Sequence, residues 1–381
     1  MLTTHRTDDS KLTDWYYGVD RPLLFCVLLL ILVGGVAAIS TGSAMMVFKK
    51  WHWYHFILNM LPFYIVGVIG MVAVSMMNKK YVLWIAWANV TVCTLLLALT
   101  QIVPCAQYGS ERWVCMSGIS LMPSDLLKPG FVFISAWFIT KMKESYGSDV
   151  FIKDAFQIKN HYNWWYYLVF VFCVLLIMIL QPDYGTAILY CGVVGGLLIF
   201  AGLPKLWIGI GAAFMTVGGA LASLFEPHVH RRVMEFIAPL DPTSQVGRSI
   251  NAIRQGGLFG MGDEASVTEK LPMAENDFVY AALVENYGAL GGCLLLVCCV
   301  YMIQRLISDA RGARDPFVYY ATLGVMLMFA IQISINLATT LHIMPPTGIT
   351  FPFVSFGGSA FLSSCLMFGM VLAIIREDKW K

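Results

Sequence analysis

The residues best suited to chemistry are a few charged and amide side chains that stand in or beside long apolar stretches. Asp125 and Lys128 are three positions apart, so they share one face of a helix. Asp277 stands at the start of another apolar stretch, and Glu285 follows two turns inside it. Ionisable side chains are costly within a membrane helix and usually mark a functional site. A carboxylate there could act as a general base, and an ammonium group could neutralise a substrate anion.

The alternative is that these polar residues only pair with one another and hold helices together. For Gln332 and Asn336, which share a helical face at i and i+4, we favour this interpretation because amides commonly join membrane helices. For Asp125, Lys128 and Asp277 we favour function, because they adjoin irregular segments predicted to lie together at the outer face.

Three irregular segments predict a cavity open to the outside. Residues 345–353 contain three prolines, which forbid a regular helix. Such backbone at membrane depth is tolerated only where it is buried in protein or lines a cavity. The glycine-rich run 256–262 follows no predicted strand, so a nucleotide-binding loop is disfavoured. Small residues at 357–360 then open the last apolar stretch and suit close packing.

The elements that must position these residues are predicted to be membrane helices. The chain has 381 residues, of which 58% are hydrophobic and 13% charged, and its mean hydropathy is +0.71. Soluble domains carry about 25% charged residues, so the composition excludes a soluble multidomain chain. It also excludes a disordered chain, a nucleic-acid-binding domain and a disulfide-dense secreted module. The predicted fold class is an all-α polytopic membrane protein, with about ten membrane-spanning segments at 22–46, 54–77, 81–103, 124–142, 164–180, 184–202, 204–224, 278–304, 317–341 and 357–375.

The charge distribution predicts the topology. An even number of helices places both termini on one side, and most of the 25 Lys and Arg residues then fall on that side. By the positive-inside rule both termini are predicted to be cytoplasmic. The expected organisation is a tail at 1–21, a membrane domain at 22–375 and a tail at 376–381. Pro182 predicts a tight hairpin between the fifth and sixth helices.

Two outer loops stand out. The loop 225–277 is long, and such loops are usually functional. Within it Val246, Ile250 and Ile253 fall at helical spacing, which predicts a short amphipathic helix at the membrane surface. The loop 104–123 contains Cys105 and Cys115, and spacing alone leaves a disulfide and two free thiols equally plausible.

The remaining cysteines and the loop histidines favour structural interpretations. The other eight of the ten cysteines lie in apolar segments, where they are most simply small hydrophobic residues. His228 and His230 form a His-x-His pattern, but no matching cluster completes a metal site. We therefore favour exposed loop histidines.

Taken together, these residues resemble the SEDS family (shape, elongation, division and sporulation) of bacterial membrane proteins. The resemblance covers nearly all of the ten predicted helices. Trp15, the run 19–21 and the Pro-Thr-Gly-x-Thr-x-Pro-Phe pattern of residues 346–353 favour the division branch. The matching motifs are Arg112-Trp113, residues 118–125 with Lys128, residues 181–186, Arg232 with Phe236 and Pro239, Ser249 and Ala252, Gly256-Gly257 and Gly260, Leu271-Pro272 with Ala274, Asp277-Phe278, Glu285 and Gly288, and Asn336 with residues 346–348, 352–353, Ser355 and 357–359.

The sequence also departs from the pattern of the family. Asp125 stands where the family usually has Glu, Glu275 where it has His, and Asn286 where it has a second Glu. Asp125 keeps the negative charge on a shorter side chain.

The resemblance implies a peptidoglycan glycosyltransferase that polymerises lipid II and releases undecaprenyl pyrophosphate. It implies that Asp277 is the catalytic base and that Lys128 meets the charge of the pyrophosphate. Asp125 would position Lys128 or coordinate a divalent cation, Mg²⁺ or Mn²⁺, although no metal cage of protein ligands is visible. Substrate contacts are expected at Arg112, Arg232, Arg248, Arg254, Glu285, Asn336 and Ser355.

Two other classes of function fit the same features. Intramembrane charges and broken helices also suit a transporter that flips lipid II, and a pure scaffold for division proteins is the third possibility. We favour the enzyme because the candidate groups gather on one face and no inverted repeat is apparent. A RodA-like elongation polymerase would differ in its partner and not in its chemistry.

The resemblance also implies a location and partners. The expected location is the bacterial inner membrane at the division septum. The expected partners are a class B penicillin-binding transpeptidase of the FtsI type, divisome regulators and membrane lipids, but no nucleic acid.

Overall fold

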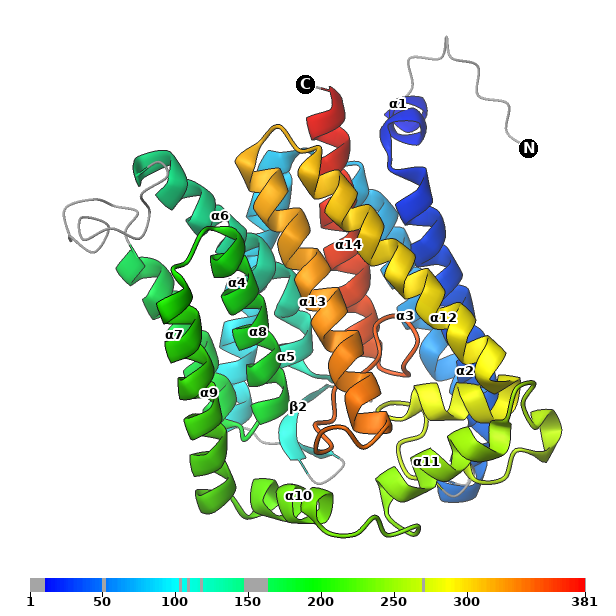
Figure 1. Ribbon diagram of the computed structural model, residues 1–381. Helices are drawn as coiled ribbons and strands as arrows, with labels where there is room; N and C mark the ends of the chain where they lie inside the picture. The colour runs from blue at the N-terminus through cyan, green and yellow to red at the C-terminus, as the bar shows by residue number, and fades with distance from the viewer. Residues whose placement is uncertain are drawn as a thin grey trace.

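The structure is a computed structural model that describes residues 11–49, 53–102, 105–107, 110–116, 119–146, 164–268 and 271–380. Its long helices run side by side as one bundle (Figure 1). A helix lies at each of the ten predicted segments: α2 (Arg21–Lys49), α3 (Trp53–Ser75), α4 (Lys79–Ile102), α6 (Lys128–Tyr146), α7 (Trp164–Leu180), α8 (Tyr184–Phe200), α9 (Lys205–Phe225), α12 (Val279–Arg311), α13 (Pro316–Thr340) and α14 (Gly358–Trp380).

Not every one of these helices has the length and composition of a membrane span. Among the described residues, seven helices are long and apolar enough to cross a membrane, and α7 and α8 are shorter apolar helices. The helix α6 carries Lys128, Lys141, Lys143 and Glu144, which lower its hydropathy. The chain is a multi-pass membrane protein, and the number of ten crossings stays a prediction.

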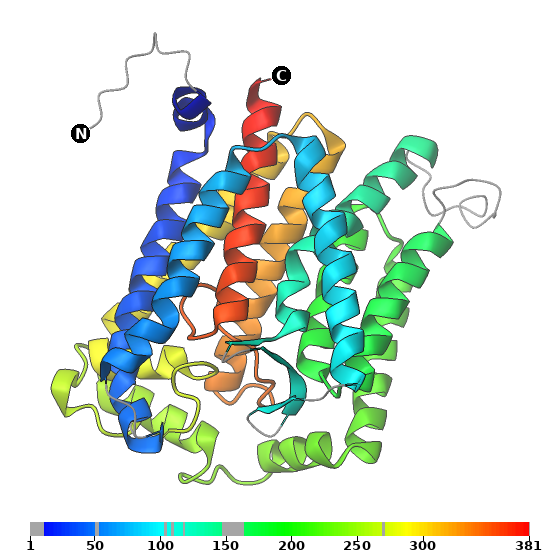
Figure 2. The ribbon, with the colours of Figure 1, turned by 180° about the vertical axis from the view of Figure 1, so that it is seen from behind.

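The core of the bundle lies around α13 and α14. These are its most buried spanning helices, and Figure 2 shows α14 in the middle of the bundle. The ring of Phe353 lies 5.2 Å from that of Phe368, so the proline-containing segment packs directly onto α14. In contrast, α9 buries none of its span and contacts mainly α8 and α10.

The expected hairpin between the fifth and sixth helices is present. α7 ends at Leu180, and Asp183 caps the first turn of α8 by accepting a hydrogen bond from the backbone N–H of Thr186. An acidic N-cap satisfies a backbone donor that has no partner in the helix, and its negative charge interacts favourably with the positive end of the helix dipole.

The outer loop before α6 folds as a small antiparallel sheet. Its strands β1 (Cys105–Gln107), β2 (Ser110–Met116) and β3 (Ile119–Leu121) are ordered β1-β2-β3, with Cys105 opposite Trp113 and Val114 opposite Leu121. A one-turn helix, α5 (Pro123–Leu126), then leads into α6, and Pro123 suits its first turn.

The long outer loop contains two helices, α10 (Pro227–Ile237) and α11 (Gln245–Gly256), and a 3-10 turn, η3 (Gly262–Glu264). The predicted helix around Val246 is therefore present, but its apolar face packs on protein and is not the expected membrane-facing stripe. Val246 and Ala252 are buried with Leu271 and Phe278 in a small core of their own. The apolar face of α11 is covered by protein because the next part of the same loop folds over it.

The glycine-rich run explains a break in α12. At Gly288 the backbone leaves helical geometry, with φ 75° and ψ 176°. The amide of Ala289 donates to Gly257 O at 2.8 Å, and the amide of Met261 donates to Glu285 O at 2.8 Å. The loop thus pairs with the broken turn of α12 backbone to backbone, and a Cβ at Gly288 would stand 2.2 Å from Leu258 O.

The segment before α2 and the end of α14 meet at the end of the bundle away from these loops. The helix α1 (Lys11–Gly18) precedes Asp20, whose carboxylate accepts hydrogen bonds from Arg305 and from Lys379. Both expected tails are partly helical: α1 lies in 1–21, and α14 continues through the expected tail to Trp380.

Candidate functional site

The first part of the site is the Lys128–Asp125 ion pair at the α5–α6 junction. Lys128 Nζ lies 2.6 Å from Asp125 Oδ1, and the two side chains are only 5% and 13% exposed. Asn89 of α4 holds this junction, because its amide donates to Leu126 O and accepts from the N–H of Gly130, both at 3.0 Å. The junction therefore holds the Lys128–Asp125 pair in position, and both charged groups are largely buried.

The second part is Asp277, two residues before α12. Asn336 donates to the backbone carbonyl of Asp277 at 2.9 Å, and the amide of Asp277 donates to Met273 O at 3.1 Å. The backbone is thus fixed from two sides. Within the part of the chain that the structure describes, the half-buried carboxylate of Asp277 accepts no hydrogen bond, and its Oδ2 lies beside Gly348.

The surroundings of Asp277 disfavour its charged form. Burial raises the pKa of Asp277 to about 6, the positive charge of Arg232 opposes this rise, and the negative charges of Glu275 and Asp125 add to it. The effect of Asp125 places the two predicted acidic residues within electrostatic range of each other. A carboxyl group with a pKa near neutrality is suited to taking up a proton during a reaction.

Arg232 belongs to the same site. It lies on α10, and its Nη1 donates to Pro346 O at 3.1 Å. Burial and the charge of Arg112 lower the pKa of Arg232, whereas Asp277 and Asp183 raise it. Arg232 therefore reaches from α10 to the proline-containing segment next to Asp277, where its charge can meet an anion.

Asn336 and Ser355 hold backbone in place. Asn336 Nδ2 also donates to Ile349 O at 2.8 Å, while Ser355 Oγ donates to Asn276 O at 2.6 Å and accepts from the amide of Phe351 at 2.7 Å. Both side chains are almost completely buried. We therefore replace the expected substrate contacts with a positioning role, since these residues connect the segment 345–355 to Asp277.

Glu285 also differs from the expectation of a substrate contact. It has no exposed surface, and its carboxylate accepts the amides of Ser266, Val267 and Thr268 at 3.0, 2.8 and 2.7 Å, as well as the hydroxyl of Thr268. A carboxylate with this many donors has little capacity left for a ligand. Glu285 is a buried anchor for the loop that leads to Asp277.

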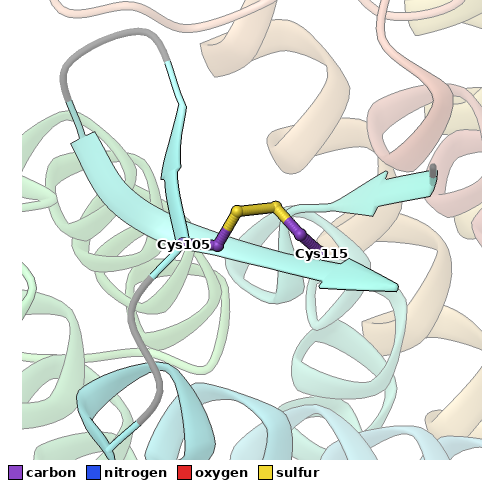
Figure 3. Close-up of a disulfide and its surroundings, with 2 residues drawn as sticks. All are labelled: Cys105 and Cys115. Atoms are coloured by element: carbon purple, nitrogen blue, oxygen red, sulfur yellow. A yellow bond between two sulfur atoms is a disulfide. The ribbon is translucent and has the colours of Figure 1, made fainter. Parts of the chain in front are cut away.

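Arg112 is held in the wall of the site by the hairpin between α7 and α8. It donates to Gln181 O at 3.0 Å, to Pro182 O and to Asp183 Oδ1 at 3.2 Å. A disulfide joins Cys105 of β1 to Cys115 of β2, the strand that carries Arg112 (Figure 3). The structure thus decides for the disulfide, and it gives Arg112 partners that compete with the predicted pyrophosphate.

Asp183 is a residue of this wall that the expected site lacked. It is buried and accepts from Arg112, from the hydroxyl of Ser124 at 3.1 Å and from the first turn of α8. Ser124 immediately precedes Asp125, so Asp183 links Arg112 to the Lys128–Asp125 junction. An acidic residue directly after Gln-Pro in a hairpin between two apolar stretches was the available signal.

Two expected arginines are not brought to Asp277. Arg254 is exposed on the last turn of α11. The charge of Arg248 contributes to lowering the pKa of Asp241. Neither is among the charges that shift the pKa of Asp277. The side chain of His228 lies outside the described residues.

A metal site of protein ligands does not fit these residues. Within the described ranges, no group of three or more His, Cys, Asp and Glu side chains could hold an ion. The ammonium of Lys128 already neutralises Asp125.

The arrangement combines a carboxylate that is ready to accept a proton with cations held at fixed positions nearby. Asp277 comes from the loop before α12, the Lys128–Asp125 pair from the start of α6, and Arg232 from α10. A displacement at a charged leaving group needs such a combination of base and fixed positive charge.

Comparison with known proteins identifies relatives over the whole chain. A family model named for FtsW, RodA and SpoVE and described as "cell cycle protein" matches residues 21–380. The probable peptidoglycan glycosyltransferase FtsW of Caulobacter vibrioides is 30% identical over 98% of this chain and 93% of its own length. Stage V sporulation protein E of Bacillus subtilis is 29% identical over 95% of this chain and 98% of its own.

Solved structures show the same fold. A structure reported for the structural coordination of polymerization and crosslinking by a peptidoglycan synthase complex aligns with a TM-score of 0.74 at 21% identity, over 95% of this chain and 99% of the other. The crystal structure of the rod shape determining protein RodA of Thermus thermophilus aligns with a TM-score of 0.67 at 21% identity, over 94% and 97%.

Proposed function

The chain belongs to the family of FtsW, RodA and SpoVE cell cycle proteins, and on this basis we propose that it is a peptidoglycan glycosyltransferase of cell division that polymerises lipid II. The observation that carries the chemistry is the Asp277 carboxylate, which is half-buried, accepts no hydrogen bond from the described residues and lies within range of Arg232 and Asp125. A relative that is 30% identical bears the name of this activity.

The reaction that we propose is a single displacement at the anomeric carbon of one lipid II. Asp277 takes the proton from the C4 hydroxyl of N-acetylglucosamine on a second lipid II, and that oxygen attacks the anomeric carbon. The bond to the pyrophosphate breaks as the β-1,4 bond forms, so undecaprenyl pyrophosphate leaves and the configuration inverts. The substrate proton ends on Asp277 and the negative charge on the leaving pyrophosphate.

The cations of the site have the second role. Lys128 lies at the buried junction with Asp125, and Arg232 lies at the proline-containing segment. We propose that these two charges stabilise the pyrophosphate as its negative charge develops. The buried charge of Lys128 is worth more than the same charge in bulk water, because no solvent has to reorganise, whereas Arg232 keeps exposed surface and is worth less.

We also propose a location and a partner for this enzyme. The location is the inner membrane at the septum. The partner is a class B penicillin-binding transpeptidase, and divisome regulators control the pair. Support for the partner comes from the related solved structure, which concerns both polymerization and crosslinking.

The decisive experiment compares the wild-type chain with Asp277→Asn, each purified with its transpeptidase partner and supplied with fluorescent lipid II. We expect glycan chains from the wild type, and a loss of roughly 10²-fold or more from Asp277→Asn because the amide cannot accept the proton. The matched control is Asp241→Asn, since Asp241 is an exposed acidic residue of the same outer loop. This control should polymerise normally.

The same reconstitution separates the alternatives. Polymerisation by Asp277→Asn at the wild-type rate would reject Asp277 as the base. If labelled lipid II crosses the bilayer without forming chains, the chain is a transporter and the enzyme proposal is wrong.

A further inference from the structure

A pocket away from the candidate site lies at the end of the bundle where α1 and α14 meet. It has a volume of about 400 Å³ and is formed by the last turns of α6 and by the connection from α12 to α13. Its lining residues are Thr140, Lys143, Glu144, Ala313, Arg314, Pro316, Tyr319 and Tyr320. Two cations and two tyrosine rings thus face one small volume.

The positive charges of this pocket are not neutralised by the described part of the chain. Neither Lys143 nor Arg314 forms an ion pair with a described residue. Lys143 Nζ lies 5.8 Å from the centre of the Tyr320 ring, which orients the ammonium group without cancelling its charge. The acidic residue of the lining, Glu144, is already paired with Lys141 at 2.6 Å.

The acidic residues near the connection are engaged elsewhere. Asp378 of α14 accepts the backbone amides of Arg314 and Asp315, at 2.8 and 3.1 Å. Asp315 pairs with Lys79 and caps α13. These contacts fix the backbone of Arg314 and leave its exposed guanidinium group available for an anion from outside the chain.

The position of the pocket along α13 indicates where that anion lies relative to the membrane. α13 has 25 residues, which at 1.5 Å per residue is roughly 37 Å, longer than the roughly 30 Å of a hydrocarbon core. The first turn of α13, with Pro316 and Tyr319, therefore extends to the level of the headgroups. Tyrosine is typical of this interface, and basic pockets between membrane helices bind anionic headgroups.

We propose that this pocket binds the phosphate of an anionic phospholipid headgroup, with Lys143 and Arg314 as the charged ligands and the tyrosines beside the glycerol. The bound lipid would join α6 to the α12–α13 connection. This site differs from that of Asp277 and does not depend on the proposed polymerase activity.

The test uses native mass spectrometry of the delipidated full-length chain titrated with phosphatidylglycerol or with phosphatidylcholine. We expect one retained phosphatidylglycerol in the wild type and an apparent affinity weaker by roughly 30-fold in Lys143→Gln/Arg314→Gln, because each cation contributes at the membrane surface. The control is Arg311→Gln, an exposed cation of the same end that does not line the pocket, and it should bind as the wild type does.

Four outcomes would overturn the proposal. The first three are equal retention of phosphatidylcholine, an equal loss of binding in Arg311→Gln, and displacement of the lipid by millimolar inorganic phosphate, which would make this a site for free anions. The swap Lys143→Arg/Arg314→Lys keeps both charges and should retain the lipid. Loss of binding in this swap while the protein stays monodisperse would also count against the site.

Discussion

Asp277 and Glu285 are both carboxylates near the start of α12, and their surroundings assign them opposite roles. Glu285 is saturated by amides of the loop 266–268, whereas the carboxylate of Asp277 accepts no hydrogen bond from the described residues. A carboxylate that is fully hydrogen-bonded fixes structure, and one that lacks donors can take up a proton. Spacing along the helix does not distinguish the two cases, because it says nothing about the donors that surround each group.

The pH dependence of polymerisation should follow Asp277. A base acts in its ionised form, so with a pKa of about 6 the value of kcat/KM should rise with pH up to about 6 and level off above it. Arg232 lowers this pKa, so Arg232→Gln should move the inflection to higher pH. The control Arg231→Gln, which removes a neighbouring exposed cation, should leave the inflection in place. An identical profile for wild type and Arg232→Gln would disprove the coupling.

Lys128 and Asp125 should stabilise the fold as a pair, whereas polymerisation should require Lys128 itself. Lys128→Met leaves Asp125 without its partner in a largely buried place, which costs about 3 kcal/mol of unfolding free energy, and it should also abolish polymerisation. Asp125→Asn/Lys128→Met removes the stranded charge, so part of the thermal stability should return while activity stays lost. Recovery of activity in the double variant would show that Lys128 has no role towards the substrate.

At the scale of elements, the glycine-rich run and the kink of α12 form one unit. Gly257 O accepts the amide of Ala289, and Gly288 has a positive φ that other residues rarely adopt. The unit begins at α11, whose buried face packs on the segment that leads to Asp277. The break in α12 therefore lets the loop from residue 256 onwards pair with α12. This helix starts two residues after Asp277, the proposed base.

Gly288→Ala should weaken this unit. A Cβ there would lie 2.2 Å from Leu258 O in a strained backbone conformation, so we expect a loss of roughly 3 kcal/mol in stability, measured as a lower Tm of the purified protein. Gly195→Ala is the matched control in α8, where a Cβ would meet nothing within 4 Å. It should leave the Tm unchanged or raise it. Equal Tm values for the two variants would contradict the role of the kink.

At the scale of the whole molecule, the bundle separates two kinds of charge. The end with α1 and the last turns of α14 carries a connected network in which Asp20, just before α2, pairs with Arg305 of α12 and Lys379 of α14, and both cations also contact Asp309. The other end carries Asp277, Arg232 and the Lys128–Asp125 pair. The first network joins helix ends to one another, and the second group of charges lies at the loops that form the candidate site.

Compartment-sensitive reporters should confirm this polarity. Reporters fused to the N-terminus and to the C-terminus should both report the cytoplasm, and one inserted at exposed Arg254 should report the outside. The reason is the excess of Lys and Arg on the side of the termini. Signals from opposite sides for the two termini would mean an odd number of crossings and would overturn the predicted topology.

Much of the fold is predictable from the sequence because its determinants are local. A run of about 20 apolar residues satisfies its own backbone hydrogen bonds only as a helix, so a helix stands at each predicted segment. Pro182 and the acidic N-cap Asp183 predict the hairpin because both act on the backbone next to them. The helices within the expected tails 1–21 and 376–381 are less predictable. Both α1 and the end of α14 are polar, and their contacts are with parts of the chain far away in sequence.

The sequence by itself determined that this is a multi-pass membrane protein of the FtsW, RodA and SpoVE family with a few charges in an apolar chain, because composition, helical spacing and motif order are properties of the chain alone. Only the tertiary structure decided what those charges do. It brought Asp277 within range of Asp125, joined Cys105 to Cys115, buried the face of α11 and gave Glu285 and Asn336 their backbone partners. These outcomes depend on which groups meet across the bundle, and the chemistry of a polar side chain is set by the neighbours that share or withhold hydrogen bonds and charge.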